Sequence, residues 1–269
     1  MEYLFSVWKE LKKQLCGKFI FLFLDYDGTL ASIAETPEKA AITAKNKETL
    51  AALLRAPQCK IAIISGRRLE DIKNRIGLEG IIYVGNHGLE IEGPKIKFKS
   101  RIPSDYTNLL QNLKSDLQGE FASVKGVVIE DKGLGLSLHY RQAPVDDIPN
   151  VKAIFQEIIS APLKENKIRI KSAKMALEIR PPVSWDKGKV ALWFLARQRF
   201  VLKDKTSVIP LYIGDDVSDE DAFKALKDKG ITIRVGAPPP PPEDSYAKYY
   251  VKDTLEVFRL LEEIEKTSV

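Results

Sequence analysis

Short apolar runs alternate with helical patterns along this chain, and each run ends on polar residues. The runs occupy 19–27, 61–66 and 81–88 near the start, and 211–216 and 231–236 near the end. The first begins with FIFLFL, six consecutive apolar residues, which is typical of a strand buried on both faces. Alternation of strand and helix predicts an α/β fold with a doubly wound parallel sheet. In such sheets the chemistry lies at the carboxyl ends of the strands.

The composition limits the classes of protein to which the chain can belong. It has 269 residues, 44% of them hydrophobic and 29% charged, so it can build a proper core and is not disordered. The net charge of +5 comes from basic residues interspersed with acidic ones, which argues against a nucleic-acid partner.

The chain also lacks the sequence signs of a membrane or secreted protein. Its longest apolar runs are far shorter than the roughly 20 residues of a membrane span, and the N-terminus lacks the pattern of a signal peptide. Cys16 and Cys59 each precede an apolar run, which favours partly buried thiols in the reducing cytosol. We expect a cytoplasmic protein without a membrane partner, and a monomer.

The middle of the chain has a different rhythm. Two amphipathic helices, the first N-capped by Ser104, are accompanied there by alternating strands, which predicts a small α+β unit inserted into the first domain. We place the core in 1–103 and 180–269 and the insert in 104–179. The proline run 238–242 is interpreted as a surface connector rather than as a proline-motif ligand.

The strands of the insert alternate between apolar and polar residues, so each should have one face on the helices and one polar face. In one strand the packed residues would be Leu134, Leu136, Leu138 and Tyr140, and the polar ones Ser137, His139 and Arg141. In the last strand the packed residues would be Met175, Leu177 and Ile179, and the polar ones Lys174, Glu178 and Arg180. The polar faces are available to a ligand.

The strongest chemical signal is Asp25-Tyr26-Asp27-Gly28-Thr29, directly after the first apolar run. A carboxylate can attack phosphorus and form an aspartyl phosphate, and a second acid can protonate the leaving oxygen and then activate water. Because two anions must approach each other, this chemistry also needs a divalent cation. An ordinary strand-end turn would explain a bare Asp-x-Asp pair, but it explains this longer motif less well.

Three further motifs can assist that chemistry, although each has a structural alternative. Gly214-Asp215-Asp216 offers a third carboxylate to Mg²⁺, or a charged helix start. Ser65-Gly66-Arg67 offers a hydroxyl and backbone N–H groups to a phosphate oxygen, or a helix cap. Lys187 could neutralise a phosphoryl group, or be a solvated lysine. The sequence has two histidines and no close Cys/His cluster, which argues against zinc hydrolysis.

In this order, the four motifs resemble those of the haloacid-dehalogenase (HAD) superfamily of phosphohydrolases. Further segments are similar to elements of trehalose-6-phosphate phosphatases, and the resemblance extends from about Phe19 to the last helix. These segments are Gly85-Asn86-His87-Gly88, Leu138-His139-Tyr140-Arg141, Glu178-Ile179-Arg180-Pro181, Asp186-Lys187-Gly188 and the stretch 214–223. The resemblance implies a Rossmann-like HAD core with a smaller α+β cap that closes over it.

The resemblance also implies a role for each site residue. Asp25 would be the nucleophile and Asp27 the general acid/base, and Lys187 would join Ser65 in binding the phosphoryl group. The Mg²⁺ ligands would be Asp25, the carbonyl group of Asp27 and Asp215, with Asp216 and Asp219 in support. Glu130, Lys132 and Glu178 of the cap would bind the hydroxyls of a disaccharide. Further substrate contacts are expected from Gly66, Arg67, His87, His139 and Arg141.

The expected function is therefore Mg²⁺-dependent hydrolysis of trehalose 6-phosphate, a small-molecule sugar phosphate, through an aspartyl phosphate. Sucrose phosphate or mannosyl-3-phosphoglycerate is the alternative substrate for the same core. A regulatory module that binds sugar phosphates without catalysis is a third hypothesis, disfavoured because both Asp25 and Asp27 are present. A phosphomutase is a fourth.

Overall fold

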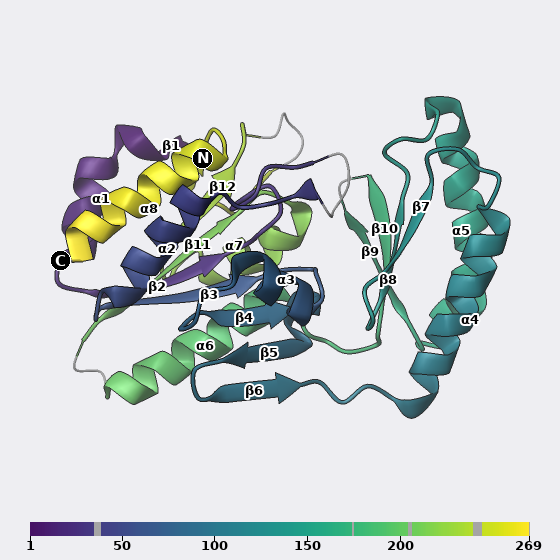
Figure 1. Cartoon of the computed structure of the whole chain (residues 1–269), viewed down its shortest axis with the longest axis horizontal. Helices are drawn as coiled ribbons and strands as arrows, with labels where there is room; N and C mark the ends of the chain where they lie inside the picture. Colours follow the sequence, from purple (N-terminus) through teal and green to yellow (C-terminus); the bar gives the residue numbers. More distant parts are fainter. Residues whose placement is uncertain (35–38, 174, 204–205, 239–243, 269) are drawn as a thin grey trace. The chain divides into compact units, whose positions relative to one another are not determined.

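The computed structural model describes residues 1–34, 39–173, 175–203, 206–238 and 244–268 (Figure 1). Lys174 and most of the proline run therefore lie outside the described residues. The chain forms two compact units, a core unit of Met1–Lys99 with Trp185–Val269 and an insert unit of Ser100–Ser184. The insert unit extends a few residues beyond 104–179 at each end.

The core unit is built on one nine-stranded sheet. Its strands, in spatial order, are β1 (Glu2–Tyr3), β13 (Tyr249–Val251), β12 (Ile231–Val235), β11 (Val208–Gly214), β2 (Phe19–Leu24), β3 (Cys59–Ile64), β4 (Ile82–Gly85), β5 (Glu90–Gly93) and β6 (Ile96–Lys99). All neighbours from β1 to β4 are parallel, whereas β5 and β6 are antiparallel. The α/β fold with a doubly wound parallel sheet is therefore confirmed.

Strand β2 lies in the middle of this sheet and is buried along its whole length. Ile20, Leu22 and Leu24 belong to the hydrophobic cluster on one face of the sheet. Phe21 and Phe23 belong to the cluster on the other face, where their rings stack. A run without polar residues is what a strand with helices on both faces requires.

Helices cover both faces of the sheet. α1 (Trp8–Leu15), α2 (Ala44–Arg55), α3 (Leu69–Ile76) and α8 (Thr254–Ser268) pack on the face of Leu22, and Figure 1 shows α2 beside α8. α6 (Lys187–Leu202) and α7 (Glu220–Leu226) pack on the face of Phe23.

The insert unit has its own core between two helices and a four-stranded antiparallel sheet. Its elements are α4 (Ser104–Glu120), α5 (Ile148–Lys164) and the strands β7 (Val128–Asp131), β8 (Leu136–His139), β10 (Ala176–Arg180) and β9 (Arg169–Ala173), in sheet order. Strand register confirms the two faces. Glu130, Ser137 and Glu178 are paired across the sheet and share the polar face, whereas Leu138 and Ile179 pack on the helices.

Three details of the insert differ from the expectations. Ser104 is the first helical residue of α4, and Pro103 stands at the cap without a side-chain hydrogen bond. Met175 is exposed with a positive φ, because it lies in the turn between β9 and β10 rather than in a strand. Arg141 follows the end of β8 in an exposed turn, so strand alternation no longer sets its direction.

Both cysteines are free thiols; Cys59 is buried as expected, but Cys16 is exposed. None of the helices among the described residues has the length and apolar character needed to cross a bilayer.

Candidate active site

The candidate site lies where four parallel strands end side by side in the core unit. Asp25 follows β2, Ser65 follows β3, Asn86 follows β4 and Asp215 follows β11. The spatial order β11-β2-β3-β4 makes these strands neighbours. Their polar carboxyl ends therefore gather at one edge of the sheet, as the sequence predicts.

A buried ion pair joins Asp25 to Lys187 at this edge. Lys187 Nζ donates to Asp25 Oδ1 at 2.7 Å and to Asp219 Oδ1 at 2.8 Å. Lys187 is the first residue of α6, where Asp186 caps the helix by accepting from the backbone N–H of Lys189. The helix start therefore holds the ammonium group between two carboxylates that come from β2 and from the start of α7.

The charges of this pair affect each other's protonation. Burial raises the pKa of the Asp25 carboxyl well above its ordinary value; Lys187 opposes this shift, while Asp219 and Asp215 add to it. Burial by itself would lower the pKa of Lys187, but Asp219 and Asp25 outweigh it, so the pKa of this ammonium group lies above its ordinary value. The site thus carries more negative charge than Lys187 alone neutralises.

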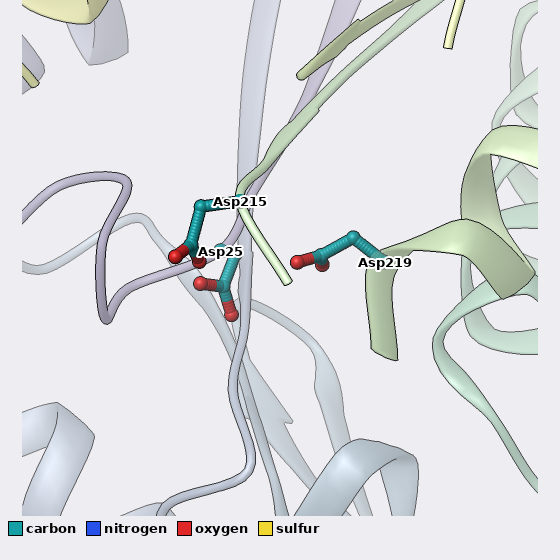
Figure 2. A group of neighbouring side chains, drawn as sticks. All are labelled: Asp25, Asp215 and Asp219. Carbon is teal, nitrogen blue, oxygen red and sulfur yellow. The ribbon is translucent and has the colours of Figure 1, made fainter. Parts of the chain in front are cut away.

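Asp25, Asp215 and Asp219 form an acidic group whose ligand oxygens lie within 4.8 Å of one another (Figure 2). Carboxylate oxygens are the ligands that hard divalent cations such as Mg²⁺ take. The close spacing of three acids and their unbalanced charge fit such a cation. In Figure 2 the carboxylate of Asp219 approaches the other two from a different side.

Asp219, and not Asp216, completes this group. The carboxylate of Asp216 accepts from the N–H of Val217 and caps the short helical turn Val217–Asp219. Asp219 is fully buried and accepts from Lys187, from the hydroxyl of Tyr212 at 2.8 Å and from the backbone N–H of Asp216 at 3.0 Å. Because three donors hold its oxygens, Asp219 is well suited to orient Lys187.

Gly28 makes room for the acidic group in the turn after β2. Its φ is +80°, and a Cβ at this position would overlap the carboxylate of Asp215. The turn is closed by the carbonyl of Tyr26, which accepts from the N–H groups of Leu30 and Ala31. A residue other than glycine would have to displace Asp215.

The loop after β4 supports the loop after β3. The backbone N–H of Asn86 donates to the carbonyl of Arg67, and that of His87 donates to the carbonyl of Ser65. Asn86 and His87 both have positive φ, and a Cβ on Gly66 would lie 2.7 Å from the His87 ring. Ser65 is buried, and its hydroxyl accepts from the N–H of Arg67. Ser65, Gly66 and His87 thus form one tightly packed corner of the site.

Asp27 and Arg67 form a forked ion pair. Arg67 Nε donates to Asp27 Oδ2 and Nη2 donates to Asp27 Oδ1, both at 2.7 Å. The side chain of Asp27 is 44% exposed, while that of Arg67 is only 7% exposed. Asp27 thus faces solvent at the edge of the site, and a buried guanidinium group holds both of its oxygens.

The polar face of the insert unit carries a second cluster of charges. Glu178 is 6% exposed and accepts from Lys132 Nζ at 2.8 Å and from Arg180 Nε at 2.9 Å. His139 Nε2 lies 2.8 Å from Glu130 Oε2 on the same face. The cluster brings together four of the five predicted insert residues, and Arg141 lies beyond the strand.

Sequence reasoning gave no role to several residues that complete these clusters. The sequence pattern places Tyr212 only in a strand and Arg180 only on a polar face, and it gives no signal for Asp71. Each completes a charge cluster by a contact that is short-range in sequence: Tyr212 donates to Asp219, Arg67 donates to Asp71, and Arg180 donates to Glu178. A polar residue inside an apolar strand, such as Tyr212 within VIPLYIG, is the one signal that could have pointed to such a contact.

The trehalose-phosphatase family model matches residues 23–254 of the chain. A trehalose-phosphate phosphatase of Mycobacterium marinum is 35% identical over 217 residues, which are 80% of this chain and 53% of that protein. The chain therefore spans about half the length of the trehalose-phosphate phosphatases it matches. It spans 17% of a longer relative from Mycobacterium tuberculosis.

Solved structures share the fold. The C-terminal domain of a Candida albicans trehalose-6-phosphate phosphatase has a TM-score of 0.79 at 22% identity, with 98% of each chain covered. A trehalose-6-phosphate phosphatase related protein has a TM-score of 0.69 at 26% identity, with 91% of this chain and 97% of the other covered.

Proposed function

Because the chain belongs to the trehalose-phosphatase family, we propose that it hydrolyses trehalose 6-phosphate to trehalose and phosphate, with Mg²⁺ and through an aspartyl phosphate. The observation that carries this proposal is the buried Asp25, paired with Lys187 beside Asp215 and Asp219 at the edge of the sheet. A carboxylate that attacks a phosphoryl group needs a cationic group and a cation site beside it, since positive charge must offset the repulsion between two anions.

In the first step a carboxylate oxygen of Asp25 attacks phosphorus, and the bond from phosphorus to the sugar oxygen breaks. Asp27 gives its proton to that oxygen, so that trehalose leaves as an alcohol. Ser65 and Lys187 hold the non-bridging oxygens of the phosphoryl group. Lys187 is suited to this because its ammonium group already lies 2.7 Å from Asp25.

In the second step Asp27, now a carboxylate, takes a proton from a water molecule that attacks the aspartyl phosphate. The bond from phosphorus to Asp25 breaks, which restores the Asp25 carboxylate and releases inorganic phosphate. Asp27 then holds the proton for the next cycle.

Asp25 and Asp215 are the side chains we propose for the Mg²⁺ site, together with the carbonyl group of Asp27. A divalent cation bound there neutralises charge on the phosphoryl oxygens and on the carboxylates. Asp219 supports the site by holding Lys187.

Recognition of the sugar is assigned to the polar face of the insert unit. Glu130, Lys132, His139 and Glu178 alternate acceptors and donors there, which suits the many hydroxyls of a disaccharide. The clamp of Lys132 and Arg180 on Glu178 fixes the direction of its carboxylate before a ligand arrives. His87 remains a proposed substrate contact of the core unit, whereas the guanidinium group of Arg67 is held by Asp27 and Asp71.

The test is phosphate release from a panel of sugar phosphates, with Mg²⁺ and with EDTA. We expect the highest kcat/KM for trehalose 6-phosphate, loss of turnover in EDTA, and no turnover in Asp25→Asn. A higher kcat/KM for sucrose phosphate or mannosyl-3-phosphoglycerate would identify that compound as the substrate and would leave the proposed mechanism unchanged. Binding without turnover would identify a regulator, and exchange of phosphate between sugar positions would identify a mutase.

A further inference from the structure

The guanidinium group of Arg67 is largely buried and contacts two aspartates and the ring of a tyrosine. Its Nε and Nη2 groups donate to Asp27, and Nη1 donates to Asp71 at 2.9 Å. Its guanidinium carbon lies 5.4 Å from the centre of the Tyr26 ring, which is fully buried. Each of these contacts restricts the guanidinium group, so its position is set before any substrate binds.

A second arginine braces this arrangement. Asp71 accepts from Arg75 Nε at 2.8 Å, and Arg75 Nη1 donates to the carbonyl of Ala40 at 2.7 Å. Asp71 and Arg75 belong to α3, one helical turn apart, while Ala40 also accepts from the hydroxyl of Tyr26. The row Asp27, Arg67, Asp71, Arg75 thus connects the edge of the site to a helix of the core unit.

We propose that Arg67, braced by Asp71, is the positioning residue that sets the orientation of the Asp27 carboxyl group for proton transfer to and from the reacting oxygens. This proposal rests on the proposed function and deepens it. Asp27 needs such support because its side chain is 44% exposed, and an exposed aspartate is otherwise free to rotate.

The fork geometry explains how Asp27 can be held and still react. A guanidinium group presents parallel N–H donors that match the two oxygens of a carboxylate. Because separate N–H groups hold Oδ1 and Oδ2, one bond can be given up to the substrate or to water while the other still fixes the side chain. A lysine offers a point charge and cannot hold both oxygens in this way.

The experiment compares two leaving groups in the full-length protein. A sugar alkoxide needs a proton to leave, whereas 4-nitrophenolate leaves without one, and kcat/KM reports only the steps up to the departure of the leaving group. We expect Arg67→Gln to lower kcat/KM for trehalose 6-phosphate about 10- to 100-fold more than for 4-nitrophenyl phosphate, a part of the usual general-acid contribution. Arg67→Lys and Asp71→Asn should also lower kcat/KM more for trehalose 6-phosphate than for 4-nitrophenyl phosphate, but by a smaller factor. These two variants replace Arg67→Gln in the experiment if that variant does not fold.

A double-mutant cycle on trehalose 6-phosphate alone gives an independent readout. If Arg67 acts through Asp27, Arg67→Gln should change kcat/KM less than about threefold in an Asp27→Asn background. Arg55→Gln, which removes the same charge from the exposed end of α2, should leave kcat/KM unchanged in both backgrounds.

Three results would overturn the inference. An equal loss on both substrates, with weaker inhibition by inorganic phosphate, would make Arg67 a phosphate ligand. An undiminished effect in the Asp27→Asn background, or no effect in the wild-type background, would separate Arg67 from Asp27. In each of these cases an active wild-type protein leaves the proposed function intact, whereas a wild-type protein that hydrolyses neither ester removes both.

Discussion

At the scale of single residues, the site depends on a few buried polar groups, and the loss of any partner among them would destabilise the fold. Lys187 lies between Asp25 and Asp219, and Tyr212 donates to Asp219 from inside a strand. A buried charge that loses its partner costs about 3–5 kcal/mol, so each member depends on the others. The same contacts that stabilise the core unit therefore also orient the groups that we propose react.

Removal of the Tyr212 hydroxyl should weaken both stability and turnover. Tyr212→Phe leaves Asp219 with one donor fewer, which should cost about 1–3 kcal/mol of unfolding free energy. A less well oriented Lys187 should lower kcat about tenfold, which corresponds to about 1.4 kcal/mol. Chemical denaturation and steady-state kinetics measure the two effects.

Tyr83→Phe is the matched control for this variant. Tyr83 is also buried, and its hydroxyl donates to the carbonyl of Leu78 at 2.7 Å, away from the acidic group. It should lose a similar amount of stability and keep its kcat. Equal kcat values for the two variants would show that Tyr212 contributes to stability alone.

Asp71 should make the stability of the protein depend on acid pH. Burial raises the pKa of its carboxyl, but the hydrogen bonds from Arg75 and Arg67 lower it more, so the pKa lies below its ordinary value of 3.8. A carboxyl with a lowered pKa in the folded state stabilises the fold above the ordinary value, and this contribution is lost as the pH falls through the lowered value.

The Tm of Asp71→Asn should therefore lie below that of the wild type at neutral pH, and this difference should become smaller below about pH 4. Asp116→Asn, at an exposed position of α4, is the control, and its Tm difference from the wild type should not change with pH in this way. A Tm difference for Asp71→Asn that stays constant down to pH 3 would contradict the prediction.

At the scale of elements, the turn after β2 decides how closely the acids can approach. Gly28 combines a positive φ with a Cβ position that the Asp215 carboxylate fills. Helix starts do the rest, since Asp186 caps α6 beside Lys187 and Asp216 caps the turn before α7. Short local signals of this kind place the functional side chains at the strand ends.

Gly28→Ala should displace Asp215 and weaken cation binding. We expect Mg²⁺ to raise the Tm of this variant much less than that of the wild type. The stabilisation by a ligand grows as RT ln(1 + [L]/Kd), so a weaker site gains less at the same Mg²⁺ concentration. Thermal unfolding over a Mg²⁺ titration measures the affinity without any activity assay.

Gly17→Ala separates this effect from backbone strain. Gly17 has a φ of +69°, and nothing lies within 4 Å of its Cβ position. It should lose about 1–2 kcal/mol of stability from the left-handed conformation and respond to Mg²⁺ like the wild type. Equal Mg²⁺ responses of the two variants would mean that Asp215 does not hold the cation.

At the scale of the whole molecule, the two compact units hold separate chemistries. The core unit carries the proposed nucleophile and the acidic group, and the insert unit carries a polar sheet face with the clamped Glu178. Each unit has a hydrophobic core of its own. Variants in one unit should therefore leave the chemistry of the other largely unchanged.

Glu178→Gln should affect the sugar and not the phosphoryl group. The loss of its charge leaves Lys132 and Arg180 without their carboxylate, so KM for trehalose 6-phosphate should rise about tenfold, while kcat/KM for 4-nitrophenyl phosphate stays the same. Glu157→Gln, at an exposed position of α5, is the control. An equal loss on both substrates would contradict sugar recognition by this face.

The parallel core, the strand-end position of Asp25, Asp27, Ser65 and Asp215, and the polar face of the insert were all predictable from the sequence. Burial on both faces leaves an uninterrupted apolar run, and burial on one face leaves an alternating one, so both patterns are local and readable. The strands β1, β5, β6 and β13, at the two ends of the sheet, have only two to four residues each, which is too short for a pattern to stand out, and only the structure shows them.

Tertiary structure alone decided which polar groups meet. Asp25 and Lys187 are 162 positions apart, and Asp27 and Arg67 are 40 apart, so no spacing in the sequence relates their side chains. Of the two supporting carboxylates expected, Asp216 and Asp219, only Asp219 joins the acidic group, because Asp216 caps a helical turn while Asp219 accepts from Tyr212 and Lys187. Sequence patterns report burial along the chain, whereas ion pairs depend on which chain segments the fold brings together.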